Sequence, residues 1–122
     1  MYDAVVGNPP FVRYQFIPQE ERSQLAALLS QGGKDLHGVS NLWIPFTLIS
    51  LELLRDQGAF ALVLPSELLA IKSAGLIRSE LIRHYDKLTL DMYPRDSFAG
   101  ILQDVMVVSG VRDVRTKRLS VK

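Results

Sequence analysis

The chain has 122 residues, of which 48% are hydrophobic and 22% charged, and its formal net charge is +1. This length suits one domain with one core, and the composition is that of a globular protein rather than a disordered or membrane-spanning one. The absence of cysteine excludes disulfides, thiolate metal sites and cysteine nucleophiles, so we expect a cytoplasmic protein without a structural disulfide.

The hydrophobic pattern predicts an alternation of strands and helices. The expected elements are, in chain order, a strand at 2–6, a helix from Pro18 to about Gln31, a helix at 42–54, a strand at 59–64, a helix at 74–83, and strands at 87–92 and 105–108. This order predicts an α/β fold of about four strands with flanking helices. The basic segment at 112–122 is expected to be a tail or the start of a linker, outside a domain at 1–111.

The helix at 42–54 has the clearest periodicity in the chain. Its expected apolar face consists of residues at four-three-four spacing, namely Leu42, Phe46, Ile49 and Leu53. Ser40 or Asn41 is the expected N-cap, and Gly58 is the expected C-terminal glycine cap. Trp43 is interpreted as a packing residue of this helix rather than as a platform for a ligand.

Two strands carry further expectations. The apolar run at 59–64 lacks alternation, which favours a strand covered on both faces, as in a parallel sheet flanked by helices. The strand at 2–6 is expected to lie at a sheet edge with apolar surface exposed.

The segment with the strongest chemical signal is Asn8-Pro9-Pro10-Phe11, which directly follows the first strand. Functional residues of open α/β sheets gather at the carboxyl ends of strands. The Asn8 side-chain oxygen and the Pro9 carbonyl can accept two hydrogen bonds from an exocyclic amine, and two prolines hold such a loop in a fixed conformation. Phe11 offers a flat face on which an extruded base can stack.

This segment resembles the catalytic motif of the amino-methyltransferases. With Gly7 before it and Val12-Arg13 after it, it is similar to the motif of N6-adenine DNA methyltransferases of restriction–modification systems. The order of elements resembles that family from Tyr2 to Val111, although only the four-residue core is specific.

The resemblance implies the C-terminal half of a Rossmann-like methyltransferase sheet, with its fourth to seventh strands and an antiparallel last strand. It implies S-adenosylmethionine as cofactor, DNA as partner, and transfer of a methyl group to N6 of a flipped adenine. Asn8, Pro9, Pro10 and Phe11 would be catalytic, and Phe98 would stack on the base from the other side. Arg13 is a candidate for DNA contact. Such a protein is expected in the cytoplasm of a bacterium or an archaeon.

The sequence departs from the family in what it omits. It lacks the glycine-rich cofactor loop and the acidic residue that binds the cofactor ribose, so most of the cofactor site would lie outside this chain. We therefore expect the N-terminal half and the target-recognition domain to be missing, and the isolated chain to be inactive. No metal is expected, because His37 and His84 show no ligand spacing.

Two other interpretations remain open at this point. The first is a methyltransferase that acts on protein glutamine or on ribosomal RNA, since such enzymes resemble the same loop. The second is a non-catalytic fragment that assembles, for example as a homodimer, through the exposed edge of its first strand.

Overall fold

The structure, a computed structural model, describes residues 1–31, 41–94 and 104–114 and shows an α/β fold. The strands are β1 (Tyr2–Gly7), β2 (Leu54–Pro65), β3 (Tyr85–Tyr93) and β4 (Val105–Arg112). The helices are α1 (Gln19–Gln31), α2 (Trp43–Glu52) and α3 (Gly75–His84), with 3-10 turns at Tyr14–Phe16, Ser66–Leu69 and Lys72–Ala74. The predicted order of elements is confirmed. None of the helices in these ranges is long and apolar enough to cross a membrane.

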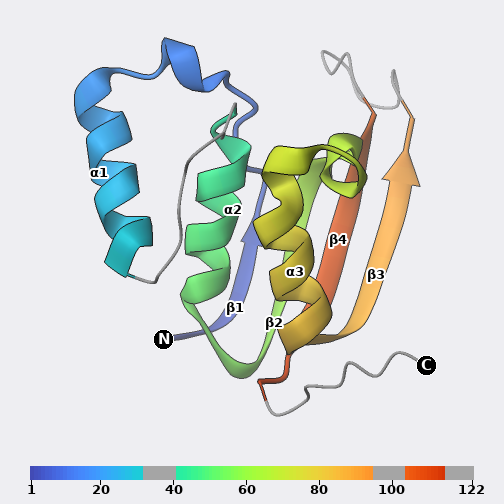
Figure 1. Cartoon of the computed structure of the whole chain (residues 1–122). Coiled ribbons are helices and arrows are strands. Elements are labelled where there is room, and N and C mark those ends of the chain that lie inside the picture. Colours follow the sequence, from blue (N-terminus) through green and yellow to red (C-terminus); the bar gives the residue numbers. More distant parts are fainter. Residues whose placement is uncertain (32–40, 95–103, 115–122) are drawn as a thin grey trace.

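The four strands form one mixed sheet in the order β1-β2-β4-β3 (Figure 1). β1 and β2 are parallel, whereas β4 runs antiparallel to both of its neighbours. The predicted antiparallel last strand and the predicted edge position of β1 are therefore confirmed. Gly7 lies opposite Leu62, so the residues that follow β1 and β2 emerge at the same edge of the sheet.

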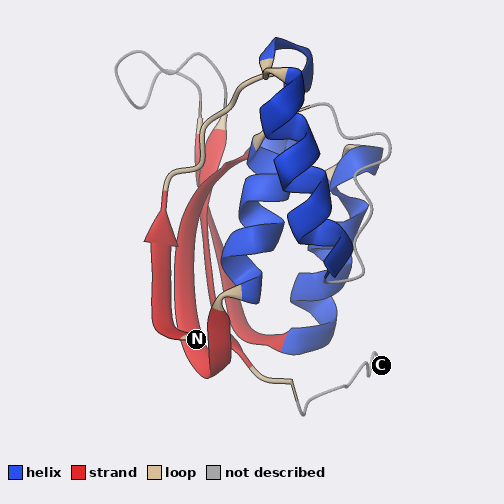
Figure 2. Cartoon of the chain, turned by 90° about the vertical axis from the view of Figure 1, so that its left-hand side faces the viewer, coloured by secondary structure: helices blue, strands red, loops and turns tan. Residues whose placement is uncertain are grey.

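The helices all lie on one face of the sheet (Figure 2). On β2 the buried side chains alternate with more exposed ones, so Phe60, Leu62 and Leu64 face the helices. The expectation that this strand is covered on both faces is wrong for the described residues. The run lacks polar residues although its other face, which carries Ala59, Ala61 and Val63, is exposed or half-buried.

The core lies between this sheet and the helices α2 and α3. Its fully buried side chains include Trp43, Ile44, Leu48, Leu54, Leu62, Leu64, Leu68, Ile77, Met106 and Val108. Each large apolar side chain contributes roughly 1.5–3 kcal/mol when it is fully removed from water. The core therefore fixes α2 against β2, and α2 in turn borders the loop that follows β1.

The buried face of α2 differs from the predicted one. Trp43, Ile44 and Leu48 are buried, whereas Phe46 is 41% exposed and Leu53 is 45% exposed. The four-three-four spacing identified a real apolar stripe, but α2 is apolar around most of its circumference. Packing on the sheet selected the face that carries the tryptophan, and the predicted stripe instead lies toward α1.

Gly58 is part of β2 and does not cap α2, contrary to the prediction. The helix ends at Glu52 and β2 begins at Leu54. A Cβ atom on Gly58 would lie 2.8 Å from Leu54 Cδ1 and 2.9 Å from the Asp3 carbonyl oxygen, so close packing of two chain segments requires glycine here. The left-handed backbone conformation belongs instead to Gln57, with φ of 69°.

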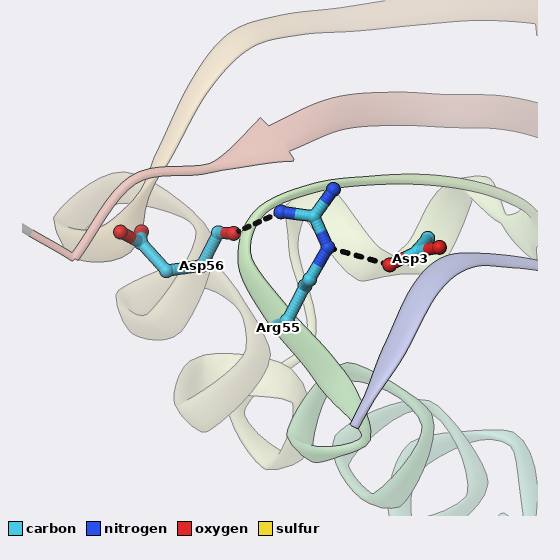
Figure 3. A network of polar contacts seen from close by, with 3 residues as sticks. All are labelled: Asp3, Arg55 and Asp56. Carbon is cyan, nitrogen blue, oxygen red and sulfur yellow. Dashed lines mark hydrogen bonds and ion pairs between the residues drawn. The ribbon is translucent and has the colours of Figure 1, made fainter.

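An exposed ion pair joins the beginnings of β1 and β2. Arg55 Nε donates to Asp3 Oδ1 at 2.6 Å, and Arg55 Nη1 donates to the Asp56 carbonyl oxygen at 2.8 Å (Figure 3). Because both partners are well exposed, such a pair contributes only about 0–1 kcal/mol. It lies at the opposite end of the sheet from the loop that follows β1.

Candidate active site

The predicted catalytic loop follows β1 at the carboxyl edge of the sheet. Asn8 is exposed, Pro9 is buried and Pro10 is exposed. Phe11 is partly buried and packs against the hydrophobic core. The loop thus presents an amide side chain to solvent while its second residue and its aromatic ring are held by the protein, which suits a group that must be fixed before it binds a substrate.

The exit of the loop is tied to the residues that begin α2. Leu42 N–H donates to the Val12 carbonyl oxygen at 2.7 Å, and Arg13 pairs with Asn41 in an antiparallel bridge. The entrance of the loop is fixed by the pairing of Gly7 with Leu62 on β2. Both ends of the loop are therefore attached to the core layer, so its carbonyl groups have defined directions.

A polar pocket of about 320 Å³ lies beside this loop exit. It is lined by Arg13, Gln15, Asn41 and Glu67. Glu67 follows β2, and its Oε1 accepts a hydrogen bond from Trp43 Nε1 at 3.3 Å. Arg13 was predicted from the sequence as a site residue, whereas Gln15 and Glu67 were not. Glu67 was detectable in principle, because it is the first charged residue after a strand that runs parallel to β1.

A larger groove, of about 510 Å³, lies between the loop exit and α1. Its lining is mainly apolar and comprises Val12, Phe16, Ile17, Pro18, Glu21, Gln24, Leu25, Leu28 and Leu42. Neither Asn8 nor Phe11 lines it. The groove is consequently separate from the groups to which the sequence assigns chemistry, in spite of its greater volume.

The structure brings together only part of the predicted site. Asn8, Pro9, Pro10 and Phe11 are consecutive and share one loop, and Arg13 follows within two residues. Phe98 lies outside the described residues, so its position relative to Phe11 stays a prediction. Among the described residues, no group of three or more His, Asp or Glu side chains could hold a metal ion.

The profile of the Eco57I restriction-modification methylase family matches residues 1–96. The chain belongs to this family. The resemblance to restriction–modification methyltransferases that the loop indicated is thereby confirmed. The family match covers the loop, both parallel strands and all three described α-helices, so the candidate site lies within the matched region.

Two curated methyltransferases show the same relationship. The chain is 29% identical over 82 residues to the type II methyltransferase M.AccI of Acinetobacter calcoaceticus. This aligned segment covers 67% of this chain and 15% of that protein. It is 36% identical over 62 residues to the type II methyltransferase M.BstVI of Geobacillus stearothermophilus. This second aligned segment covers 51% of this chain and 10% of that protein. The matched segments thus span a small part of either relative.

A solved structure supports the fold assignment. A class I S-adenosylmethionine-dependent methyltransferase from Listeria monocytogenes superimposes with a TM-score of 0.63 and 14% identity. The superposition covers 98% of this chain and 35% of that protein. The predicted fold class, part of a Rossmann-like methyltransferase sheet, is therefore confirmed for this member of the Eco57I restriction-modification methylase family.

Proposed function

We propose that the chain is the catalytic-loop part of a DNA methyltransferase that transfers a methyl group from S-adenosylmethionine to N6 of a flipped adenine. One observation carries the proposal: an exposed asparagine at the carboxyl end of β1 is followed directly by a buried proline. Family membership supports methyl transfer and a DNA substrate. Such a protein would act in the cytoplasm of a bacterium or an archaeon, where its DNA substrate is located.

The residues of this chain would act on the accepting amine. The exocyclic amine of adenine is a weak nucleophile, because its lone pair is delocalised into the ring. When the Asn8 side-chain oxygen and the Pro9 carbonyl oxygen each accept a hydrogen bond from one N–H of this amine, the lone pair localises on the nitrogen. The fixed ends of the loop hold the backbone of both residues in place before the base arrives, which lowers the reorganisation that the reaction requires.

Aromatic and basic groups near the loop would hold the substrate. Phe11 keeps part of its surface exposed while it packs on the core, so one face of its ring can stack on an extruded base. Phe98 is the proposed partner on the other face of that base. Arg13 is exposed and follows the loop, which suits a contact with a DNA phosphate.

S-adenosylmethionine, when bound, supplies an electrophilic methyl group. The described residues do not by themselves fit this cofactor, because none of the described strands is followed by the glycine-rich turn of the family. We therefore assign no residue of this chain to cofactor binding. The rest of the cofactor site would belong to protein segments outside the 122 residues, as the 15% and 10% shares of the relatives suggest.

The free edge of β1 is the proposed junction with those segments. β1 pairs only with β2 among the described strands, and Val6 is 81% exposed. An unpaired strand edge with an apolar side chain favours pairing with a further strand, supplied by an N-terminal half or by a second copy of the chain. Light scattering of the isolated chain distinguishes the two partners. A homodimer supports pairing of β1 with a second copy of the chain, whereas a monomer supports pairing of β1 with a strand of the N-terminal half.

The experiment that tests the substrate uses the full-length protein with S-adenosylmethionine labelled on its methyl group. Duplex DNA, ribosomal RNA and a glutamine-containing protein substrate are offered in parallel. The proposal predicts label in DNA and its recovery as N6-methyladenine after digestion. Label in RNA or in glutamine, with unlabelled DNA, would replace this proposal with the corresponding alternative.

A further inference from the structure

The polar pocket beside the loop exit has features of a binding subsite in its own right. Its lining combines one cationic side chain, Arg13, one carboxylate, Glu67, and the amides of Gln15 and Asn41. Glu67 follows β2, whereas the other three come from the loop exit and the residues before α2. Side chains far apart in the sequence thus converge at the sheet edge that carries Asn8.

Two of these side chains are held in place by the core layer. Trp43 is 0% exposed, and its indole N–H donates to Glu67 Oε1 at 3.3 Å. The second carboxylate oxygen has no hydrogen bond within the described part of the chain. The Asn41 side-chain oxygen Oδ1 accepts a hydrogen bond from the backbone N–H of Trp43 at 3.4 Å. A carboxylate held on one side by a buried donor presents its remaining lone pairs in a defined direction.

The charged side chains that line the pocket indicate the class of ligand that it can bind. The charges of Arg13 and Glu67 are opposite and balance, so an isolated phosphate would meet a carboxylate as well as a guanidinium. A nucleobase edge suits the set better, because exocyclic amino groups donate to carboxylates and ring acceptors receive hydrogen bonds from amides and guanidinium groups. Neither Asn8 nor Phe11 lines the pocket, so its occupant is not the base on which Asn8 acts.

We propose that this pocket binds the edge of the nucleobase adjacent to the target adenine on the same DNA strand, with Glu67 accepting a hydrogen bond from that base. The proposal rests on the proposed function, since it requires a target base at Asn8. It assigns part of the DNA contact to the catalytic layer itself, and it adds Gln15 and Glu67 to Arg13, which the sequence already indicated as a DNA-contact candidate.

The test compares Glu67→Gln with wild type in the full-length protein. Glutamine keeps an acceptor for Trp43 but removes the charge, so the fold should be retained. The matched control is Glu80→Gln, which makes the same chemical change at a residue of α3 that does not line the pocket. The KM for DNA and kcat are measured on an intact duplex and on duplexes that lack a single base on either side of the target or opposite it.

The expected result is a KM for the intact duplex that rises about tenfold in Glu67→Gln, with kcat nearly unchanged and no change in Glu80→Gln. On the duplex that lacks the same-strand neighbour, wild type and Glu67→Gln should have the same KM, because the contact is already lost. Gln15→Ala, at an exposed position with little risk to folding, should raise KM by about threefold and show the same dependence.

Several results would overturn the inference while leaving the proposed function intact. One is a KM for DNA that is unchanged in both Glu67→Gln and Gln15→Ala. Another is an increase in KM that persists on every duplex that lacks a base. A third is a KM difference from wild type that disappears only when the opposite-strand base is removed. A fall in kcat at constant KM would also overturn it, since that pattern belongs to a positioning role for Glu67. Absence of adenine methylation by wild type would instead contradict the proposed function.

Discussion

Replacement of Arg112 by methionine tests how the sheet holds α2, the helix that fixes the loop exit. Arg112 Nη1 donates to the Leu54 carbonyl oxygen at 2.6 Å and to the Leu51 carbonyl oxygen at 3.2 Å, at the end of α2. The hydroxyl of Tyr85 also donates to the Leu51 oxygen, at 3.4 Å. Methionine would keep much of the volume of the side chain and remove both of its hydrogen bonds.

The expected loss is about 1–4 kcal/mol of unfolding free energy. A buried carbonyl left without a partner costs about 1–3 kcal/mol, and the loss of a cation at a helix C-terminus costs about 0.3–1 kcal/mol more. The Leu51 oxygen retains the Tyr85 donor, so most of the loss arises at Leu54. The control is Arg55→Met, which removes an arginine from an exposed pair and should cost less than about 1 kcal/mol.

The free energy of unfolding of both variants is measured by urea denaturation, with tryptophan fluorescence as the signal. The chain has one tryptophan, Trp43, which is fully buried in the folded state and therefore reports on unfolding of the core. Equal losses in Arg112→Met and Arg55→Met would refute the argument, because they would show that the contacts at the end of α2 contribute no more than an exposed ion pair.

Three further outcomes follow from the same structure. Gly110→Ala should destabilise the chain by about 1–3 kcal/mol, since a Cβ there would lie 3.2 Å from both the Asp86 carbonyl oxygen and the buried ring of Phe60. Gly75→Ala on α3 should be neutral or stabilise by up to about 1 kcal/mol, and thermal unfolding separates the two. Burial raises the pKa of Tyr85 from 10.0 to about 12, with Arg112 lowering it in part. The contribution of Tyr85 to stability should therefore be constant below pH 10 and fall by about 3 kcal/mol as the pH rises from 10 to 12; a flat urea midpoint across that window would contradict this. Calorimetric titration of the isolated chain with S-adenosylmethionine should show weak or no binding, and micromolar affinity would contradict the view that most of the cofactor site lies elsewhere.

The sequence allowed the arrangement of strands to be predicted more closely than the packing of helices. The parallel pair and the antiparallel last strand follow from the order of elements and from the resemblance to a methyltransferase sheet. The buried face of α2 did not follow, because Trp43 and Leu48 form an apolar stripe as complete as the one through Phe46. Only the sheet surface decides which stripe is buried, and that surface is assembled from strands distant in the sequence.

The site shows the same division between local and assembled features. Asn8 and Pro9 are recognisable because their chemistry lies in consecutive residues at the end of a strand. Glu67 is 59 positions from Asn8 in the sequence, and it reaches the same edge only because β1 and β2 are parallel with Gly7 opposite Leu62. Its hydrogen bond to a buried tryptophan has no counterpart in a local sequence pattern.

The central claim is that Asn8 polarises the amine of a target adenine, and one measurement tests it most directly. Full-length wild-type protein and the Asn8→Ala variant are incubated with labelled S-adenosylmethionine and mixed-sequence duplex DNA, with Arg55→Ala as the control at the other end of the sheet. Asn8 is exposed, so its replacement should leave the fold intact while N6-methyladenine formation falls by a factor on the order of 10² or more and the control stays at the wild-type rate. N6-methyladenine formed at an undiminished rate by Asn8→Ala would contradict the role assigned to this side chain.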